Sequence, residues 1–422
     1  MKFIADLHIH SRFSRATSKD MTLENIERWA QLKGISVIGT GDFTHPQWFK
    51  DIQEKLTPAE EGLFRLRTPS SEYVHPSCQR HIRFILSVEI SSIYSKNNRL
   101  RKVHNLILVP TLEAATKINT SLSHVGNLSA DGRPILGLDS KDLLEICLES
   151  SAEVIFIPAH AWTPHFSVFG SNSGFDSMEE CFEELSPHIK AIETGLSSDP
   201  PMNWRVKALD KLTLVSNSDA HSPEKIGREA NIIEGNLTYH HIKKAIERKD
   251  GFKGTIEFFP EEGKYHFDGH RLCQALLSPS ETKKLNELCP RCGKKVTVGV
   301  MHRVEELADR PEGFKLPGAP PYYSLVPLPE IIAQVRGTGT GTKGVAEEYH
   351  HLLEKLGDEF KILLEVPVSQ IEKISSLVLA EAIRRVREGK IKISPGYDGE
   401  YGKIEVITPA ERDKFSQQLS LF

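Results

Sequence analysis

Short apolar runs alternate with amphipathic segments along the first 255 residues. The runs have the length of buried strands and lie at 3–7, 35–38, 82–88, 103–109, 154–157, 189–192 and 212–215. Helical periodicity separates several of them, most clearly at 23–33 and 141–149. Seven strands with intervening helices predict an α/β fold, either a β/α barrel or a doubly wound sheet. No Gly-x-Gly-x-x-Gly motif follows the first strand, which argues against a dinucleotide-binding fold.

Beyond residue 255 the pattern changes twice. Residues 256–300 form a short segment that carries both cysteine and histidine. Residues 301–415 contain a Gly/Thr tract at 337–344 and a long predicted helix around 374–388, so we expect this third region to be mainly helical. The last residues, 416–422, have the composition of a tail.

Composition narrows the class of protein. The 422 residues are 39% hydrophobic and 26% charged, which is enough apolar material for a sizeable core and excludes a wholly disordered chain. The net charge of −4 excludes a globally basic, histone-like DNA binder but allows a local basic face. No stretch approaches the ~20 apolar residues of a membrane span, and residues 1–6 lack the layout of a signal peptide. We therefore expect a cytoplasmic protein.

Potential metal ligands lie at or just beyond the ends of the predicted strands. They are Asp6, His8, His10, Asp42, His45, Glu89, His160, Asp219 and His221. In a barrel of parallel strands these ends meet on one face, where such folds place active sites. The strand period of two places His8 and His10 on one side, and Asp219 and His221 repeat that spacing. His104 lies instead at the start of a run, which indicates an antiparallel strand.

This set of imidazoles and carboxylates is too large for one ion. It suffices for two or three divalent ions (Zn²⁺, Mn²⁺, Mg²⁺ or Fe²⁺) with carboxylates bridging. Two ions ~3.5–4 Å apart can activate water and stabilise the leaving oxygen in phosphodiester cleavage. The alternative is that these histidines are ordinary polar core residues, an explanation that suits a lone histidine better than two paired motifs at strand ends.

A second, smaller metal site is predicted in the Cys/His segment. Cys289 and Cys292 have the spacing of a zinc knuckle, and His270 and Cys273 form a second pair with the same spacing upstream. His266 competes with His270 for the fourth position. Four protein ligands leave no open position, so we expect one structural Zn²⁺ and a small domain that needs this ion to fold. The alternative is free thiols without metal.

The third region carries candidate DNA-binding groups in a glycine-rich tract, a basic helix end and tyrosine-bearing loops. They are Gly341, Lys343, Gly344, Arg384, Arg385, Arg387, Tyr322, Tyr323 and Tyr397. Glycines let backbone N–H groups approach a phosphate, basic side chains neutralise it, and exposed aromatics can stack on an extruded base. The alternatives are a flexible surface loop, a solvated or dipole-compensating helix end, and aromatics packed under the loops.

The tail sequence resembles the peptide by which bacterial repair and replication proteins dock on the β sliding clamp. Gln418, Leu419, Leu421 and Phe422 carry that pattern. In such a peptide the two large apolar residues enter an apolar pocket while the glutamine forms a hydrogen bond at its rim. The alternative is a frayed terminus.

The strand-end motifs resemble the polymerase and histidinol phosphatase (PHP) superfamily. The resemblance implies a distorted seven-stranded β/α barrel that hydrolyses phosphoesters with up to three metal ions, with Glu89, His160 and Asp219 as catalytic residues. The implied ligand sets are His8, His10, Glu89 and Asp219 for one ion, Glu89, His104 and His160 for a second, and His45 and His221 with Asp42 for a third. Two departures affect the third ion: extra residues separate Asp42 from His45, and Arg15 and Ala16 occupy a stretch where members often carry another histidine.

The order of segments over essentially all 422 residues resembles the endonuclease Q family. The barrel motifs are followed by the His270–Cys292 site, then by 304–310 and by 395–402. The resemblance implies a metal-dependent DNA repair endonuclease, associated with the nucleoid, that nicks 5′ to deaminated bases (uracil, hypoxanthine, xanthine) and abasic sites and leaves 3′-hydroxyl and 5′-phosphate ends. It implies a phosphoesterase barrel at 1–255, a structural zinc domain at 256–300, a DNA-binding region at 301–415 and a clamp-binding tail at 416–422.

Two other functions remain as alternatives. A small-molecule phosphatase of the histidinol phosphate kind would need only the barrel, so it would stay active after truncation beyond residue 255. A non-catalytic DNA-binding adaptor with a degenerate barrel would bind one zinc per chain, whereas the enzyme would bind three or four ions.

Overall fold

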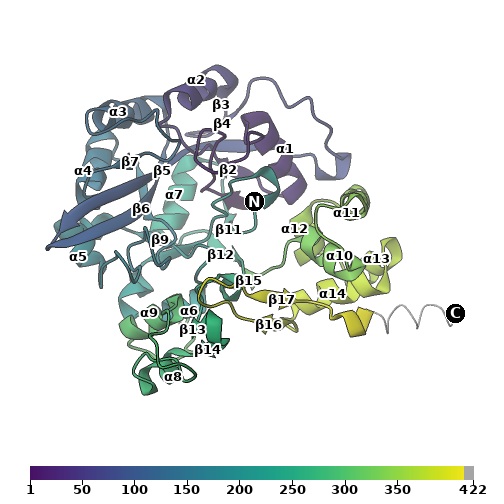
Figure 1. Cartoon of the computed structure of the whole chain (residues 1–422). Coiled ribbons are helices and arrows are strands. Elements are labelled where there is room, and N and C mark those ends of the chain that lie inside the picture. The colour runs from purple at the N-terminus through teal and green to yellow at the C-terminus, as the bar shows by residue number, and fades with distance from the viewer. Residues whose placement is uncertain (413–422) are drawn as a thin grey trace.

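The computed structural model describes residues 1–412 and contains an α/β unit built on an eleven-stranded sheet (Figure 1). The helices of the C-terminal region, green to yellow in Figure 1, lie beside this unit. The eleven strands are β1 (Lys2–Asp6), β2 (Val37–Gly39), β3 (Leu56–Pro58), β4 (Phe64–Leu66), β5 (Arg83–Lys96), β6 (Arg99–Val109), β7 (Ile135–Leu136), β8 (Ile155–Pro158), β11 (Ala230–Glu234), β12 (Phe252–Glu257) and β15 (Tyr322–Ser324). The predicted α/β class and the helical C-terminal region are confirmed.

The sheet mixes parallel and antiparallel pairs. Its main path runs β15-β12-β11-β1-β2-β5-β4-β3, with β1, β2 and β5 mutually parallel. Strand β6 pairs with β5 along its whole length and also with β8, antiparallel in both cases. The antiparallel direction predicted for the strand of His104 is therefore confirmed.

The last two predicted strands, β9 (Ala191–Glu193) and β10 (Thr213–Val215), form a separate parallel pair. Buried amides connect the end of β10 to β1. The Asn231 Nδ2 donates to the carbonyls of Ala5 (3.2 Å) and Ser216 (2.8 Å), and Asn217 Oδ1 accepts from the Leu7 N–H at 2.9 Å. Side-chain amides thus connect β10 to β1, which are not paired with each other as strands within residues 1–412.

The helices of this unit are α1 (Leu23–Lys33), α2 (Pro46–Lys55), α3 (Leu112–Ser123), α4 (Ser140–Ser150), α5 (Met178–Phe182), α6 (Pro200–Trp204) and α7 (Tyr239–Arg248). Six of these seven helices begin at a residue whose side chain caps them, and α2 is the exception. For α1, the Thr22 side chain accepts from the Asn25 N–H, and Gly34 ends the helix with φ 95°. Among the described residues no helix combines the length and the apolar character that a membrane crossing requires.

One buried cluster shows how the strand alternation builds the core. Phe3, Ala5 and Leu7 are 3% exposed or less and pack with Ile242 and Ile246 of α7. These positions alternate along β1, as the period of two requires. The intervening positions continue to Asp6, His8 and His10, and these two histidines belong to the site described below.

The Cys/His segment contains β13 (Asp268–His270), β14 (Ala275–Leu277) and α8 (Pro279–Lys284). The predicted boundary at residue 300 coincides with the first residue of α9 (Val300–Leu307), which packs back on this segment. The buried Asp268 carboxylate accepts from the Gly299 N–H at 2.7 Å and meets His302 Nδ1 at 2.7 Å. The boundaries of the predicted domains remain predictions.

The C-terminal region contains α10 (Leu328–Arg336), α11 (Lys343–Leu356), α12 (Glu359–Leu364), α13 (Val368–Ile374), α14 (Leu377–Arg387) and the hairpin β16 (Lys392–Ser394) and β17 (Lys403–Glu405). The expectation of one long helix around 374–388 is wrong at its start. Ser375 leaves the helical conformation (φ −128°, ψ −128°), and the Ser376 side chain caps α14 by accepting from the Leu379 N–H. A buried ion pair, Lys33 Nζ to Glu359 Oε2 at 2.7 Å, connects this region to α1.

Candidate functional site

The first and last predicted ligand motifs lie side by side in space. Ile9 forms an isolated parallel bridge with Ala220, and the His10 N–H donates to the Ala220 carbonyl at 3.0 Å. This bridge continues the direction of β1 beyond its end, so His8 and His10 face the same side as the side chain of Asp219. Backbone pairing of two segments 210 residues apart therefore assembles the centre of the site.

The first candidate ligand group contains His8, His10, Glu89 and Asp219, whose ligand atoms all lie within 4.8 Å of one another. The His10 Nε2 lies 2.9 Å from Asp219 Oδ1 and 3.3 Å from Glu89 Oε2. The His8 Nε2 lies 3.7 Å from Glu89 Oε2. Two imidazoles and two carboxylates at this separation can hold one divalent ion.

The second candidate group contains Glu89, His104 and His160. The Glu89 Oε1 lies 2.6 Å from His104 Nδ1 and 2.9 Å from His160 Nε2. The other oxygen of the same carboxylate, Oε2, faces the first group. Glu89 is therefore placed to bridge two ions, as the sequence predicts for a carboxylate in this position.

Each of the four imidazoles is held through the nitrogen that points away from the centre. The partners are Glu193 for His8 Nδ1 (3.0 Å), Asp42 for His10 Nδ1 (3.1 Å), Ser91 for His104 Nε2 (3.1 Å) and Thr163 for His160 Nδ1 (3.1 Å). Such partners fix the ring orientation and the tautomer of metal-binding histidines. Three residues of the site, Asp42 (φ 50°), His160 (φ 31°) and Asp219 (φ 47°), also have left-handed backbone, a strain typical of functional sites.

The donor set fits divalent ions by its protonation and by one unpaired atom. The buried His8 Nε2 has no hydrogen-bond partner in the described part of the chain. Burial alone would raise the pKa of the Glu89 carboxyl, but His104, Arg133 and His8 more than offset it and hold that pKa well below its usual value. Burial lowers the pKa of His104 to about 4. For His8, His10 and His160 the neighbouring carboxylates outweigh burial and raise the pKa, so the centre attracts positive charge, which a divalent ion would supply.

The carboxylate of Glu193 connects several parts of the centre. Besides His8, it accepts from the His160 N–H at 2.9 Å and from Asn217 Nδ2 at 2.8 Å. Glu193 is 0% exposed and stands at the end of β9. It therefore fixes one imidazole of the first group and the backbone of the second.

We expect Glu193→Gln to weaken metal binding about 10–100-fold, the usual cost of losing such a partner. The new amide N–H₂ would replace one acceptor oxygen by a donor. It would then face another donor, either the His160 N–H or the His8 and Asn217 side chains, and one of these hydrogen bonds would be lost. Metal retention against a graded chelator measures the effect, with the exposed Glu184→Gln as the control. Equal retention in both variants would show that Glu193 does not position the ligands.

The residues predicted for a third ion do not converge as a group of three ligand atoms in residues 1–412. The Asp42 carboxylate accepts from the Ser11 N–H and hydroxyl, at 2.7 and 2.6 Å, while it holds His10. The His45 ring stacks on Phe13 with centroids 4.4 Å apart. His221 lies against the His10 ring, 4.5 Å away. The third-ion assignment of Asp42, His45 and His221 stays a prediction.

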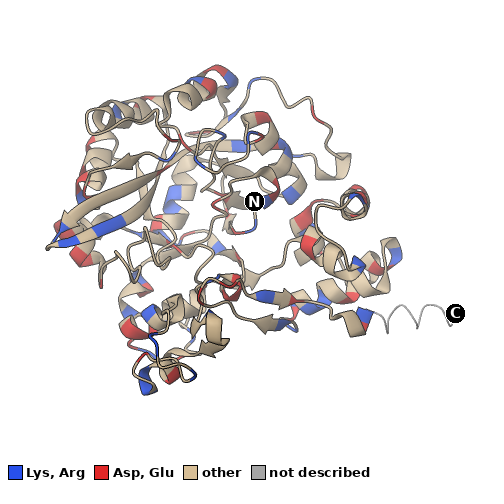
Figure 2. Cartoon of the chain, viewed as in Figure 1, with Lys and Arg blue, Asp and Glu red and all other residues tan. Residues whose placement is uncertain are grey.

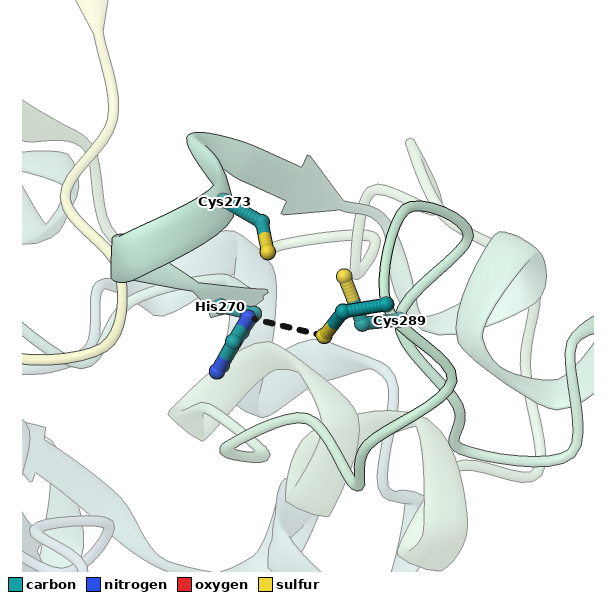
Figure 3. A group of neighbouring side chains, drawn as sticks. His270, Cys273 and Cys289 are labelled. Atoms are coloured by element: carbon teal, nitrogen blue, oxygen red, sulfur yellow. Dashed lines mark hydrogen bonds between the residues drawn. The ribbon is translucent and has the colours of Figure 1, made fainter.

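The four predicted ligands of the small site come together. His270, Cys273, Cys289 and Cys292 have ligand atoms within 4.8 Å of one another. Figure 3 shows His270, Cys273 and Cys289 approaching from β13, from the turn after it and from a facing loop. The competing His266 is buried beside Phe267 and lies outside this group. One imidazole and three thiols at this separation suit tetrahedral Zn²⁺.

A cavity of about 1050 Å³ opens beside the second ligand group. Thr163, which holds His160, is part of its wall, and so are Arg228, Lys264, Tyr265 and Tyr401. The Lys264 Nζ lies 5.5 Å from the Tyr265 ring centroid and 5.8 Å from that of Tyr401, which is 77% exposed. Exposed aromatic rings and a cation therefore line a hollow next to the candidate centre.

The predicted DNA-binding arginines are engaged within the chain. Arg384 pairs with Glu381 and Glu388, and Arg385 pairs with Glu381 and Glu411. Arg387 donates to carbonyls at the end of α12, including that of Leu363 at 2.8 Å. Acidic residues are interspersed with basic ones over these helices (Figure 2). Their contact with DNA stays a prediction.

The other predicted DNA-binding residues differ in exposure. The Gly/Thr tract forms the turn between α10 and α11. In it Gly341 is exposed, Gly344 is half-buried beside Arg336, and Lys343 is 89% exposed, 3.3 Å from Glu347. Of the tyrosines, Tyr323 is 40% exposed, Tyr322 meets the Trp204 ring edge-on and Tyr397 lies over Gly269. The tail residues Gln418, Leu419, Leu421 and Phe422 lie outside the described residues.

Two residues of the site, Glu193 and Arg133, are absent from the ligands and partners predicted from the sequence. Glu193 ends a predicted strand, so the rule that found Glu89 applies to it as well. Arg133 lies in a loop and donates to Glu89 Oε2 at 3.0 Å. No spacing rule connects a loop arginine to a carboxylate 44 residues away, so its position follows only from the fold.

Comparison with curated sequences finds relatives in archaea and bacteria. A family model described as the MJ0043 C-terminal domain matches residues 327–390. The uncharacterized protein MJ0043 of Methanocaldococcus jannaschii is 36% identical over 66% of this chain, which spans about a third (35%) of that relative's length. The uncharacterized protein YqxK of Bacillus subtilis is 29% identical over 96% of this chain and 99% of its own length.

Comparison with solved structures finds full-length similarity. The lesion-specific endonuclease PfuEndoQ from Pyrococcus furiosus superimposes with a TM-score of 0.84 at 33% identity, covering 96% of this chain and 95% of its own. A structure of endonuclease Q in complex with a 27-mer duplex substrate carrying an abasic lesion at the active site gives a TM-score of 0.82 at 32% identity, over 97% and 98%.

An α/β protein with a buried His/carboxylate centre at its strand ends agrees with the resemblance to the PHP superfamily. Similarity over the whole length, at more than 30% identity, is more specific. The chain belongs to the endonuclease Q family.

Proposed function

We propose that this protein is a metal-dependent DNA repair endonuclease. It nicks the phosphodiester 5′ to deaminated bases (uracil, hypoxanthine, xanthine) and abasic sites, and leaves 3′-hydroxyl and 5′-phosphate ends. The observation that carries the proposal is the combination of two adjacent ligand groups sharing Glu89 with full-length similarity to a lesion-specific endonuclease. The structure of a relative bound to a duplex with an abasic lesion supports the substrate class.

The proposed reaction is hydrolysis at phosphorus. A water oxygen bonds to phosphorus, the bond from phosphorus to O3′ breaks, and a proton passes to O3′ to give the 3′-hydroxyl. Divalent ions, when bound, activate the water and stabilise the leaving oxygen. The chain holds them through Glu89, His160 and Asp219 with the remaining histidines, while Glu193 and Thr163 keep the imidazoles oriented. Mn²⁺, Fe²⁺ and Zn²⁺ suit this mixture of imidazoles and carboxylates, whereas Mg²⁺ prefers oxygen ligands.

The three regions have distinct proposed roles. Residues 1–255 form a distorted seven-stranded barrel, in which the amides of Asn217 and Asn231 join β10 to β1. Residues 256–300 form a structural zinc domain around His270. Residues 301–415 bind DNA. The cavity beside His160 receives the extruded nucleotide, because stacking on rings such as Tyr401 offsets part of the few kcal/mol that extrusion costs.

Labelled duplexes that differ in one nucleotide test this function. Duplexes with uracil, hypoxanthine, xanthine, an abasic site or no lesion are incubated with the protein and divalent ions, and the product ends are mapped. We expect a single nick 5′ to each lesion, a 3′-hydroxyl end, and no cleavage of the undamaged duplex. Cleavage without regard to the lesion, or hydrolysis of phosphomonoesters alone, would contradict the proposal.

We also propose that the tail docks on the bacterial β sliding clamp. Deletion of Phe422 should abolish clamp pull-down while cleavage of short duplexes stays unchanged, because the apolar side chain fills the clamp pocket and lies outside the catalytic unit. Ser420→Ala serves as the control, since Ser420 is not one of the four residues of the motif. Clamp binding that survives the deletion would disprove this role.

A further inference from the structure

A guanidinium stands at the candidate centre among the ligands. The side chain of Arg133 is 25% exposed, and its Nη1 donates at 3.0 Å to Oε2 of Glu89, which is 0% exposed. Within residues 1–412, no other lysine or arginine side chain pairs with a carboxylate of either His/carboxylate ligand group. The arginine therefore reaches from the surface of the site to the carboxylate that the two groups share.

The loop that carries Arg133 is fixed to the segment after β1. The Gly132 N–H donates to the Phe13 carbonyl at 3.0 Å. The Asp131 carboxylate accepts from the N–H groups of both Arg15 and Arg133 at 3.1 Å. Gly132 lies so close to the site that an added Cβ would come within 2.3 Å of the Asp42 carboxylate. Arg133 is thus held beside the His8–His10 motif by several independent contacts.

The guanidinium has donors to spare. Its contact with Glu89 uses one N–H, and Nε and Nη2 have no hydrogen-bond partner in the described part of the chain. The Glu89 carboxylate compensates the guanidinium in the protein alone, and divalent ions in the two ligand groups would add positive charge that attracts a further anion.

We propose that Arg133 binds the scissile phosphate, as a catalytic residue that contacts its nonbridging oxygens. An arginine fork matches two phosphate oxygens, and it stabilises the charge that builds up on them as water attacks. This inference rests on the proposed function, because it takes the reacting group to be a phosphodiester. The same contact applies to any phosphate seated over the two ligand groups.

Arg133→Ala and Arg133→Lys test the role, with Arg12→Ala as the control. Arg12 lies on the neighbouring segment, is 36% exposed and pairs with Asp51 away from the centre. For a duplex with one abasic site we expect Arg133→Ala to lower kcat about 10²–10³-fold with KM changed little. Added guanidinium ions should restore part of that loss, and Arg133→Lys should be intermediate because it keeps the charge without the fork. Arg12→Ala should match the wild type.

Two further readouts separate this role from a merely structural one. The metal content of Arg133→Ala should equal that of the wild type, and binding of inorganic phosphate to the metal-loaded protein should weaken at least about 10-fold. Unchanged phosphate affinity and kcat would overturn the proposal, and so would loss of bound metal, since the arginine would then only support Glu89. If the wild type binds phosphate through Arg133 but cuts no duplex, the phosphate site stands and the proposed nuclease function fails.

Discussion

Asp219→Asn should remove DNA cleavage while DNA binding persists. The substitution keeps the shape of a side chain whose oxygen lies 2.9 Å from His10 Nε2, but it removes the negative charge from the first ligand group. Loss of a direct ligand should cost more than the 10–100-fold of an orienting partner, so we expect single-turnover cleavage to fall at least about 10³-fold. Fluorescence anisotropy with the same abasic duplex should show an affinity within about twofold of the wild type, because backbone contacts elsewhere supply most of it.

The control for this variant is Asp250→Asn. Asp250 follows α7, pairs with Lys244 of that helix and belongs to neither ligand group. This control should cut and bind as the wild type does. Full activity in Asp219→Asn would refute the assigned role of Asp219. A parallel loss of cleavage and binding would indicate that the variant misfolds, which far-UV circular dichroism of both proteins checks.

Cys289→Ser should release the structural ion and unfold the small domain around it. The buried Cys289 thiol is one of four converging ligands, and the local apolar cluster consists of Ala275, Leu277, Cys289 and Val296. So small a core supplies little folding energy, whereas a structural zinc in a small domain supplies about 10–16 kcal/mol of apparent binding energy. We expect zinc stoichiometry to fall by one per chain and limited proteolysis to cut between residues 271 and 299.

Ser280→Ala, on the exposed face of the neighbouring α8, is the control and should keep its zinc and its resistance to protease. The His/carboxylate centre should still bind its ions in Cys289→Ser, because that centre lies at the eleven-stranded sheet and not in the small Cys/His segment. A Cys289→Ser protein with full zinc content and native proteolysis would show that the four residues do not form a zinc site.

Much of this structure follows from sequence because strand patterns are local. All seven apolar runs are strands, and the reversed position of His104 correctly indicates an antiparallel strand. Ligands at strand ends come together because β1, β2 and β5 are parallel neighbours, so their ends lie at the same edge of the sheet. Glu193 obeys the same rule as Glu89, because it stands at the end of a predicted strand, and the sequence was therefore sufficient to predict it.

Other features depend on packing that no local pattern shows. Arg133 reaches the centre only because its loop is bound to the backbone of Phe13 and Arg15. The arginines of α14 look free in the sequence, but Glu381 and Glu411 lie within reach of them in the fold. The helix breaks before α14 because the Ser376 side chain caps a new helix there. Helical periodicity continues across this point, so it does not show the break.

Anomalous diffraction from crystals of the protein purified without chelators would locate any bound ions by element. We expect one zinc peak about 2.3 Å from the thiolates of Cys273, Cys289 and Cys292, and two further peaks on either side of the Glu89 carboxylate, one toward His8 and His10 and one toward His104 and His160. A His/carboxylate centre that stays without peaks, even after soaking with Zn²⁺ or Mn²⁺, would contradict a metal-dependent nuclease.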